Sequence, residues 1–213
     1  MFDLSLTDIL ARIPAIIVVL TVFGYAQAQT AVWLGDPTPK LAGRLNLYPT
    51  SHLELVGTLV MLLIGFGWSK PVPMDPNNFE NPRRDITLVT FAGPVFSLIV
   101  GFIVAFILVL GTSMGFITSL GLIEVLRTIM LYSVGIALFC LIPIPPLPGF
   151  NLVLPWLPPT WQLRYYQLGI WNLIFLIILI NTPILTSVIR PLMLNILHIY
   201  SIIMQAILGS SFL

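Results

Sequence analysis

Two side chains that could take part in acid–base or metal chemistry stand close together in this sequence, His52 and Glu54. An imidazole and a carboxylate can both bind zinc, but a zinc site takes at least three such protein ligands. Residues two apart on a helix do not face each other. The only other histidine is His198, and the single cysteine is Cys140. The pair therefore indicates a hydrogen-bonded turn or an ion pair at a membrane edge in preference to a metal centre.

A rigid turn ends one of the long apolar runs. Residues 142–150 read IPIPPLPGF, with four prolines and one glycine in nine positions. Proline fixes φ and removes a backbone donor, and irregular backbone at membrane depth is tolerated only where protein buries it or where it lines a cavity. Such a turn would suit a metal-binding or charged group, yet these nine residues contain no carboxylate, imidazole or thiol.

Amides and a hydroxyl interrupt the first apolar run at Gln27, Gln29 and Thr30. Polar side chains within a bilayer face the bundle interior and hydrogen-bond across helices. Two interpretations follow. These groups form a polar pocket that receives a peptide or lipid group, or they are satisfied by neighbouring helices and bind nothing.

The elements that position these residues belong to a membrane protein. Of 213 residues, 58% are hydrophobic and 8% are charged, whereas a soluble domain carries about 25% charged residues. Four long runs contain no Asp, Glu, Lys, Arg or His: residues 13–35, 86–123, 128–163 and 165–189. A helix of about 20 apolar residues crosses the hydrocarbon core, so the sequence predicts an all-α polytopic membrane protein. A net charge of +1 excludes a basic nucleic-acid surface.

We expect about five to six membrane segments. Their predicted ranges are 13–34, 53–68, 86–110, 123–141, 168–189 and 191–213, with an interruption near 181–183. The second is short and is predicted to be tilted or re-entrant, which would gather the basic residues of both flanking loops on one side. The prolines of residues 70–84 favour an extended strand or hairpin. Aromatic residues suited to a headgroup belt are Trp156, Trp161, Tyr165 and Tyr166.

Four stretches occur in an order that resembles the small bacterial members of the site-2 protease family, which are intramembrane zinc metalloproteases. They read LGDPTPKLAGRL at 34–45, PTSHLELVG at 49–57, GWSKPVPMDPNNFENPRR at 67–84, leading into the Ala-Gly-Pro of 92–94, and LIPIPPLPG at 141–149. The resemblance implies a single membrane domain over residues 1–213. Residues 13–150 would form a site-2-protease-like core, and residues 151–213 would add C-terminal helices.

The family's chemistry implies two histidines at i and i+4 and a later aspartate as zinc ligands, with a glutamate beside the first histidine as general base. By the family's spacing, the H-E-x-x-H motif falls on residues 23–27. Its histidine positions are Phe23 and Gln27, its glutamate position is Gly24, and the aspartate of the P-P-L-D-G turn is Pro148. No other H-E-x-x-H occurs in the chain. The resemblance therefore implies no catalytic residue and no zinc cofactor here.

Two further polar positions of the family differ, because its asparagines correspond to Ser97 and Cys140. We therefore interpret the chain as a pseudoprotease of the bacterial cytoplasmic membrane that binds or scaffolds a membrane partner, such as a transmembrane protein or peptide. Its candidate binding residues are Gln27, Gln29, His52 and Glu54. The alternative is an active intramembrane metalloendopeptidase that uses displaced ligands. A transporter or channel ranks last, because it would ordinarily place ionisable residues inside the helices.

Overall fold

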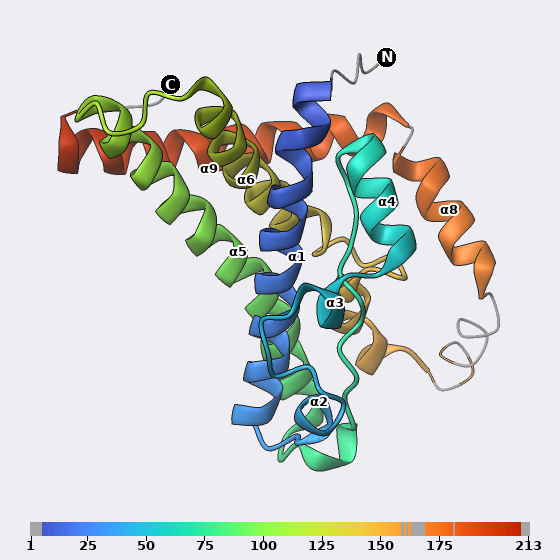
Figure 1. Cartoon of the computed structure of the whole chain (residues 1–213). Helices are drawn as coiled ribbons and strands as arrows, with labels where there is room; N and C mark the ends of the chain where they lie inside the picture. The colour runs from blue at the N-terminus through green and yellow to red at the C-terminus, as the bar shows by residue number, and fades with distance from the viewer. Residues whose placement is uncertain (1–5, 159, 161, 163–168, 181, 210–213) are drawn as a thin grey trace.

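The computed structural model describes residues 6–158, 160, 162, 169–180 and 182–209. Within these residues the fold is helical and contains no strand (Figure 1). The helices are α1 Leu6–Trp33, α2 Thr38–Leu41, α3 Pro49–His52, α4 Leu55–Ile64, η1 Pro76–Asn78, α5 Pro82–Ser113, α6 Leu120–Phe139, η2 Pro148–Leu152, η3 Leu154–Trp156, α8 Ile170–Ile180 and α9 Pro183–Leu208. The all-α prediction is confirmed.

The centre of the molecule is a bundle of α1, α5 and α6, which pack against one another (Figure 1). Bulky side chains that are fully buried between them include Leu20, Phe23 and Phe139. Small residues on α5, such as Gly93 and Gly101, let the neighbouring helices approach closely, as is usual between membrane helices. Together with α9, these are the helices of the described chain that are long and apolar enough to cross a bilayer.

The second apolar segment does not cross as a helix. It forms α4, whose ten residues span about 15 Å at 1.5 Å per residue, roughly half of the hydrocarbon core. The helix ends at Gly65, which adopts a left-handed conformation with φ +91°. The chain then turns back, so that Ser69 forms an isolated antiparallel bridge with Leu53 at the start of the segment. The re-entrant alternative is therefore the one that the fold adopts.

This return brings the two charged loops to the same end of the molecule. The Arg44 guanidinium donates through Nη2 to the Lys70 carbonyl oxygen over 3.2 Å and also to that of Pro71. The predicted strand or hairpin of residues 70–84 is absent, and η1 is the regular element observed between Ser69 and α5. Pro71 and Pro73 lack the N–H groups that a ladder needs, which accounts for the difference.

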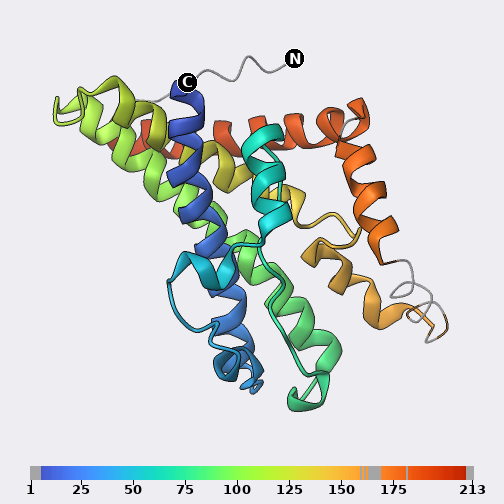
Figure 2. The same cartoon turned by 45° about the vertical axis from the view of Figure 1, so that its right-hand side comes forward.

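The C-terminal part consists of α8 and α9, which meet at the predicted interruption near residues 181–183. The last helix was expected to begin at Pro191, but α9 begins at Pro183 and continues through Pro191. It lies across the long axis of α1 in both views (Figures 1 and 2). Trp156 of the expected aromatic belt is exposed, whereas Trp161, Tyr165 and Tyr166 fall outside the described residues.

Candidate functional site

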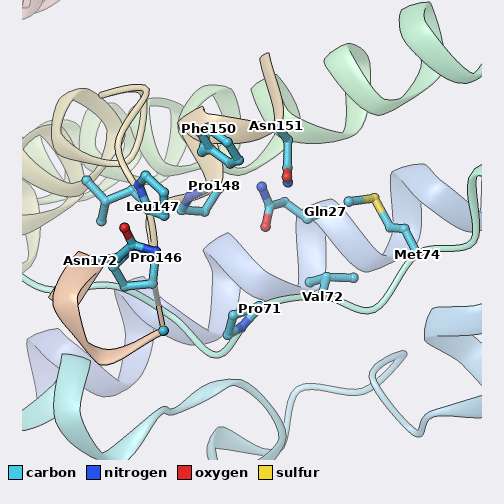
Figure 3. A pocket seen from close by; sticks show the side chains of 12 residues that line it. Gln27, Pro71, Val72, Met74, Pro146, Leu147, Pro148, Phe150, Asn151 and Asn172 are labelled. Atoms are coloured by element: carbon cyan, nitrogen blue, oxygen red, sulfur yellow. The ribbon is translucent and has the colours of Figure 1, made fainter. Parts of the chain in front are cut away.

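The proline turn and the polar part of α1 meet at a pocket of about 300 Å³. Gln27 contributes from α1, Leu147 and Pro148 from the turn, and Asn172 from α8. Another wall is formed by Pro71, Val72 and Met74, which follow the return of the re-entrant segment. Figure 3 shows the Gln27 carboxamide between Pro148 and Asn151 on one side and Val72 on the other. The helix packing thus brings the expected positions 27 and 148 together.

Gln27 and Gln29 differ in role. The Gln27 side chain is 4% exposed, and its Nε2 donates to the Thr90 carbonyl oxygen of α5 over 3.4 Å. Gln29 is half-buried and accepts a hydrogen bond from the Tyr25 hydroxyl over 3.1 Å, within α1. Of the two, only Gln27 lines the pocket. Its bond to Thr90 is also the kind of interhelical hydrogen bond expected if these polar groups are satisfied by neighbouring helices and bind nothing. Gln29 is therefore not part of this candidate site.

The positions next to Gln27 on α1 are tightly filled. Phe23 is fully buried, and its ring lies so close to Gly93 of α5 that a Cβ at that glycine would stand 2.7 Å from it. On the other side, a Cβ at Gly24 would stand 2.6 Å from Nδ1 of His52. Such a separation is far inside van der Waals contact. A side chain at position 24 therefore requires the imidazole to move.

His52 is completely buried at the end of α3. Its Nε2 lies 2.7 Å from the Asn46 carbonyl oxygen, which can only accept, so Nε2 carries the proton and donates. Nδ1 then presents a lone pair towards Gly24 and has no hydrogen-bond partner. Burial lowers the pKa of the His52 imidazole, and the positive charge of Arg44 lowers it further, although the bond to Asn46 opposes both. The imidazole is neutral near pH 7.

Glu54 does not pair with His52 but caps the re-entrant helix. Its Oε2 accepts from the Gly57 N–H over 2.6 Å at the N-terminus of α4, a position where a carboxylate satisfies free backbone donors and complements the helix dipole. His52 and Glu54 thus make separate hydrogen bonds, to Asn46 and to Gly57, and no ion pair joins them in the described structure. Neither His52 nor Glu54 lines the pocket at the proline turn, so the structure separates both from Gln27 as binding residues.

The turn itself is held against the end of α6. The Gly149 N–H donates to the Cys140 carbonyl oxygen over 2.7 Å, and the Leu147 N–H donates to that of Ile144 over 2.9 Å. A Cβ at Gly149 would lie 2.5 Å from the backbone of Leu141, so only glycine fits there. The backbone is thus fixed by its own hydrogen bonds and close packing.

Sequence reasoning missed two supports of this site, of which the first is Arg44. Its side chain is 5% exposed, and its bonds to the 70–71 backbone hold Pro71 at the pocket wall. Burial lowers its pKa, and its Nη1 has no hydrogen-bond partner. A basic residue in a polar loop gives no sequence signal for such burial.

The second missed support is Asp36, which joins the same two loops. Its buried carboxylate accepts from the Asn78 Nδ2 over 2.8 Å, from the Asp75 N–H over 3.0 Å, and from both the N–H and the hydroxyl of Thr38. Burial raises the pKa of the Asp36 carboxyl, but these donors outweigh it and leave the pKa below its ordinary value. The Asp-Pro-Thr sequence is a recognisable local turn, although its distant donors are not.

The residues at this site do not fit a zinc ion. Phenylalanine and proline offer no side-chain donor atom at positions 23 and 148, and the Gln27 amide is engaged with Thr90. Across the described residues, no three His, Cys, Asp or Glu side chains gather as a metal would require.

Comparison with known proteins places the chain in a family. It is 37% identical, over 202 residues, to a protein of Bacillus subtilis (strain 168) named "Putative zinc metalloprotease YwhC", and the match covers 91% of this chain and 92% of the relative. No model of a known protein family matches, and no solved structure matches. Identity at this level across nearly the full length of both proteins shows common descent, and the chain belongs to the site-2-protease-like family of membrane proteins.

Proposed function

We propose that this chain is a non-catalytic member of its family, which binds or scaffolds a membrane partner without hydrolysing it. The observation that carries the proposal is the set of residues at the four positions where the family's chemistry is expected: Phe23, Gly24, Gln27 and Pro148. A metal-activated water needs a ligand set and a general base. None of these four side chains is a zinc ligand of the usual kinds or a base.

The packing around these positions supports the same conclusion. The Phe23 ring packs directly against Gly93, and the His52 imidazole occupies the space that a side chain at Gly24 would need. By contrast, the pocket beside Pro148 remains open, with about 300 Å³ of accessible volume. Its carboxamides, at Gln27, Asn151 and Asn172, can exchange hydrogen bonds with a peptide backbone. We infer that a segment of a transmembrane protein or peptide occupies it.

The alternative, an active metalloendopeptidase with displaced ligands, is favoured by the name of the Bacillus subtilis relative, which describes a zinc metalloprotease. Zinc content separates the two. We expect the purified protein to contain no stoichiometric zinc when elemental analysis is performed in a mild detergent. About one zinc per chain, removable by a chelator together with peptidase activity, would establish the alternative instead.

A designed gain of zinc tests the assignment of the positions. The triple variant Phe23→His, Gln27→His and Pro148→Asp restores the ligand set and leaves Gly24 free of a side chain that would collide with His52. We expect it to bind zinc measurably more tightly than the parent, because the i, i+4 spacing and the turn remain in place. The control is the same variant with Gln29→His in place of Gln27→His. Equal binding by the two variants would show that the positions are wrong.

Partner binding is tested separately by photocrosslinking in cells. A photoreactive amino acid at Asn151, which lines the pocket, should capture a membrane protein that the same group at the exposed Ile107 of α5 does not. Identical products from both positions would mean that the pocket holds no specific partner.

A further inference from the structure

A second cavity, of about 500 Å³, lies between α5, α6 and α9. It shares no lining residue with the pocket at the proline turn. Most of its wall is apolar and is formed by Leu108, Met130, Met193 and Leu197. Its size lies within the range of about 300–1,000 Å³ that is common for ligand pockets. Neither the family's chemistry nor the proposed partner site accounts for it.

The polar groups of this cavity gather at one end of the bundle. Thr112 lies in the last turn of α5, and Arg127 lies seven residues into α6, beyond the short turn that joins the two helices. Seven residues of helix correspond to about 10 Å, a depth from which an arginine side chain can reach the headgroup region. The cavity is thus amphipathic, with a cationic rim and an apolar interior.

Arg127 is the only charged residue of the lining, and its charge is not neutralised there. Among the described residues, the ion pair observed is that of Arg84 with Asp85, so Arg127 has no carboxylate within 4.0 Å. Glu124, one turn earlier on α6, lies outside the lining and makes no such pair. The Thr112 hydroxyl donates to the Leu108 and Val109 carbonyl oxygens, over 2.8 and 3.1 Å. Arg127 is therefore the donor available to a ligand.

We propose that this cavity binds an anionic glycerophospholipid, with its phosphate on Arg127 and an acyl chain between α5, α6 and α9. An arginine fork binds phosphate oxygens through two parallel hydrogen bonds, and an unpaired cation at the rim selects a headgroup with net negative charge. Methionine side chains at positions 130 and 193 adapt to a flexible chain. Helix α9 contributes Met193, Leu194 and Leu197 to the wall and so covers the acyl chain from one side.

The test is native mass spectrometry of the purified full chain, titrated with phosphatidylglycerol or with phosphatidylcholine of the same acyl chains. We expect one phosphatidylglycerol to bind with higher affinity than phosphatidylcholine. Arg127→Gln should lower that affinity about tenfold, as expected for the loss of a charge-assisted hydrogen bond. The matched control is Arg190→Gln, which removes an exposed arginine of α9 that lies outside the lining and should leave the affinity unchanged.

A second variant examines the apolar part of the cavity. Met193→Trp fills the space between the helices, and we expect it to displace the bound lipid while Arg127 is retained. Equal phosphatidylglycerol binding by the parent, Arg127→Gln and Met193→Trp would overturn the proposal. If the parent forms a dimer that Met193→Trp abolishes without a change in lipid count, that result would also overturn the proposal, because the cavity would then be a contact between two copies of the chain.

Discussion

The two loop clusters that support the candidate site differ in how well their buried polar atoms are satisfied. The carboxylate of Asp36 accepts four hydrogen bonds from Thr38, Asp75 and Asn78. A short distance along the chain, Nδ1 of His52 and Nη1 of Arg44 are buried without partners. Both clusters connect the loop after α1 to the loop that returns from α4, but only the first is fully hydrogen-bonded.

The Asp36 cluster is therefore a structural clamp between the two loops. The cluster of His52 and Arg44 instead contains buried atoms that lower the stability of the fold. A satisfied buried network holds its elements in a unique arrangement, whereas an unpaired buried polar atom costs free energy. The unpaired Nδ1 faces Gly24, the position at which the family's general base is expected. On the proposed function, the imidazole is a former neighbour of that group and has no remaining partner. The following predictions test this comparison, from the largest expected effect to the smallest.

Removal of the Asp36 carboxylate should have the largest effect on stability. Asp36→Ala leaves the donors of Thr38, Asp75 and Asn78 without their acceptor, and we expect the free energy of unfolding to fall by about 3 kcal/mol. The measurement is thermal or denaturant unfolding in a mild detergent. The matched control is Asp75→Ala, whose carboxylate is more exposed and bonds only to Asn77. Equal losses in the two variants would refute the role of Asp36 as a clamp.

A methyl group at position 24 should destabilise the protein by about 1–3 kcal/mol, because overpacking costs that amount and the new Cβ would meet His52 at 2.6 Å. The sign of the stability change distinguishes a glycine packed against a neighbour from one with free space. Glycine to alanine in a helix normally stabilises by up to about 1 kcal/mol, and Gly135→Ala in α6, where no atom lies within 4 Å of an added Cβ, should do so. If Gly24→Ala stabilises as well, the imidazole does not pack on Gly24.

Acidification from pH 7 to pH 5.5 should destabilise the His52 cluster, by less than either substitution above. The folded-state pKa of His52 lies below the ordinary value because of burial and of Arg44. Below about pH 6.5, His52 is therefore protonated in the unfolded chain but not in the folded chain. The free energy of unfolding then decreases as the pH is lowered, until the pH reaches the folded-state pKa. His52→Gln should flatten this dependence of the unfolding temperature. His198→Gln, on the exposed part of α9, should leave it unchanged.

Much of the fold follows from sequence. Long uncharged apolar runs have to become membrane helices, because only a helix satisfies every backbone donor and acceptor within its own segment. Breaker residues mark where such helices end: the sequence Asn-Thr-Pro at residues 181–183 interrupts the last apolar region, and α8 ends at Ile180 while α9 begins at Pro183. The meeting of Gln27 with Pro148 was implied by the resemblance and not by any local pattern.

Other features depend on contacts between residues that are distant in sequence, and no local pattern encodes these. The burial of Arg44 depends on the carbonyl groups of Lys70 and Pro71, and the capture of Asp36 depends on Asn78. The separation of His52 from Glu54 arises because α3 and α4 are distinct helices, each with its own cap. Periodicity fixes which residues are apolar, but packing decides which neighbour each polar atom meets. For Nδ1 of His52 that neighbour is Gly24, and this contact exists only in the folded chain.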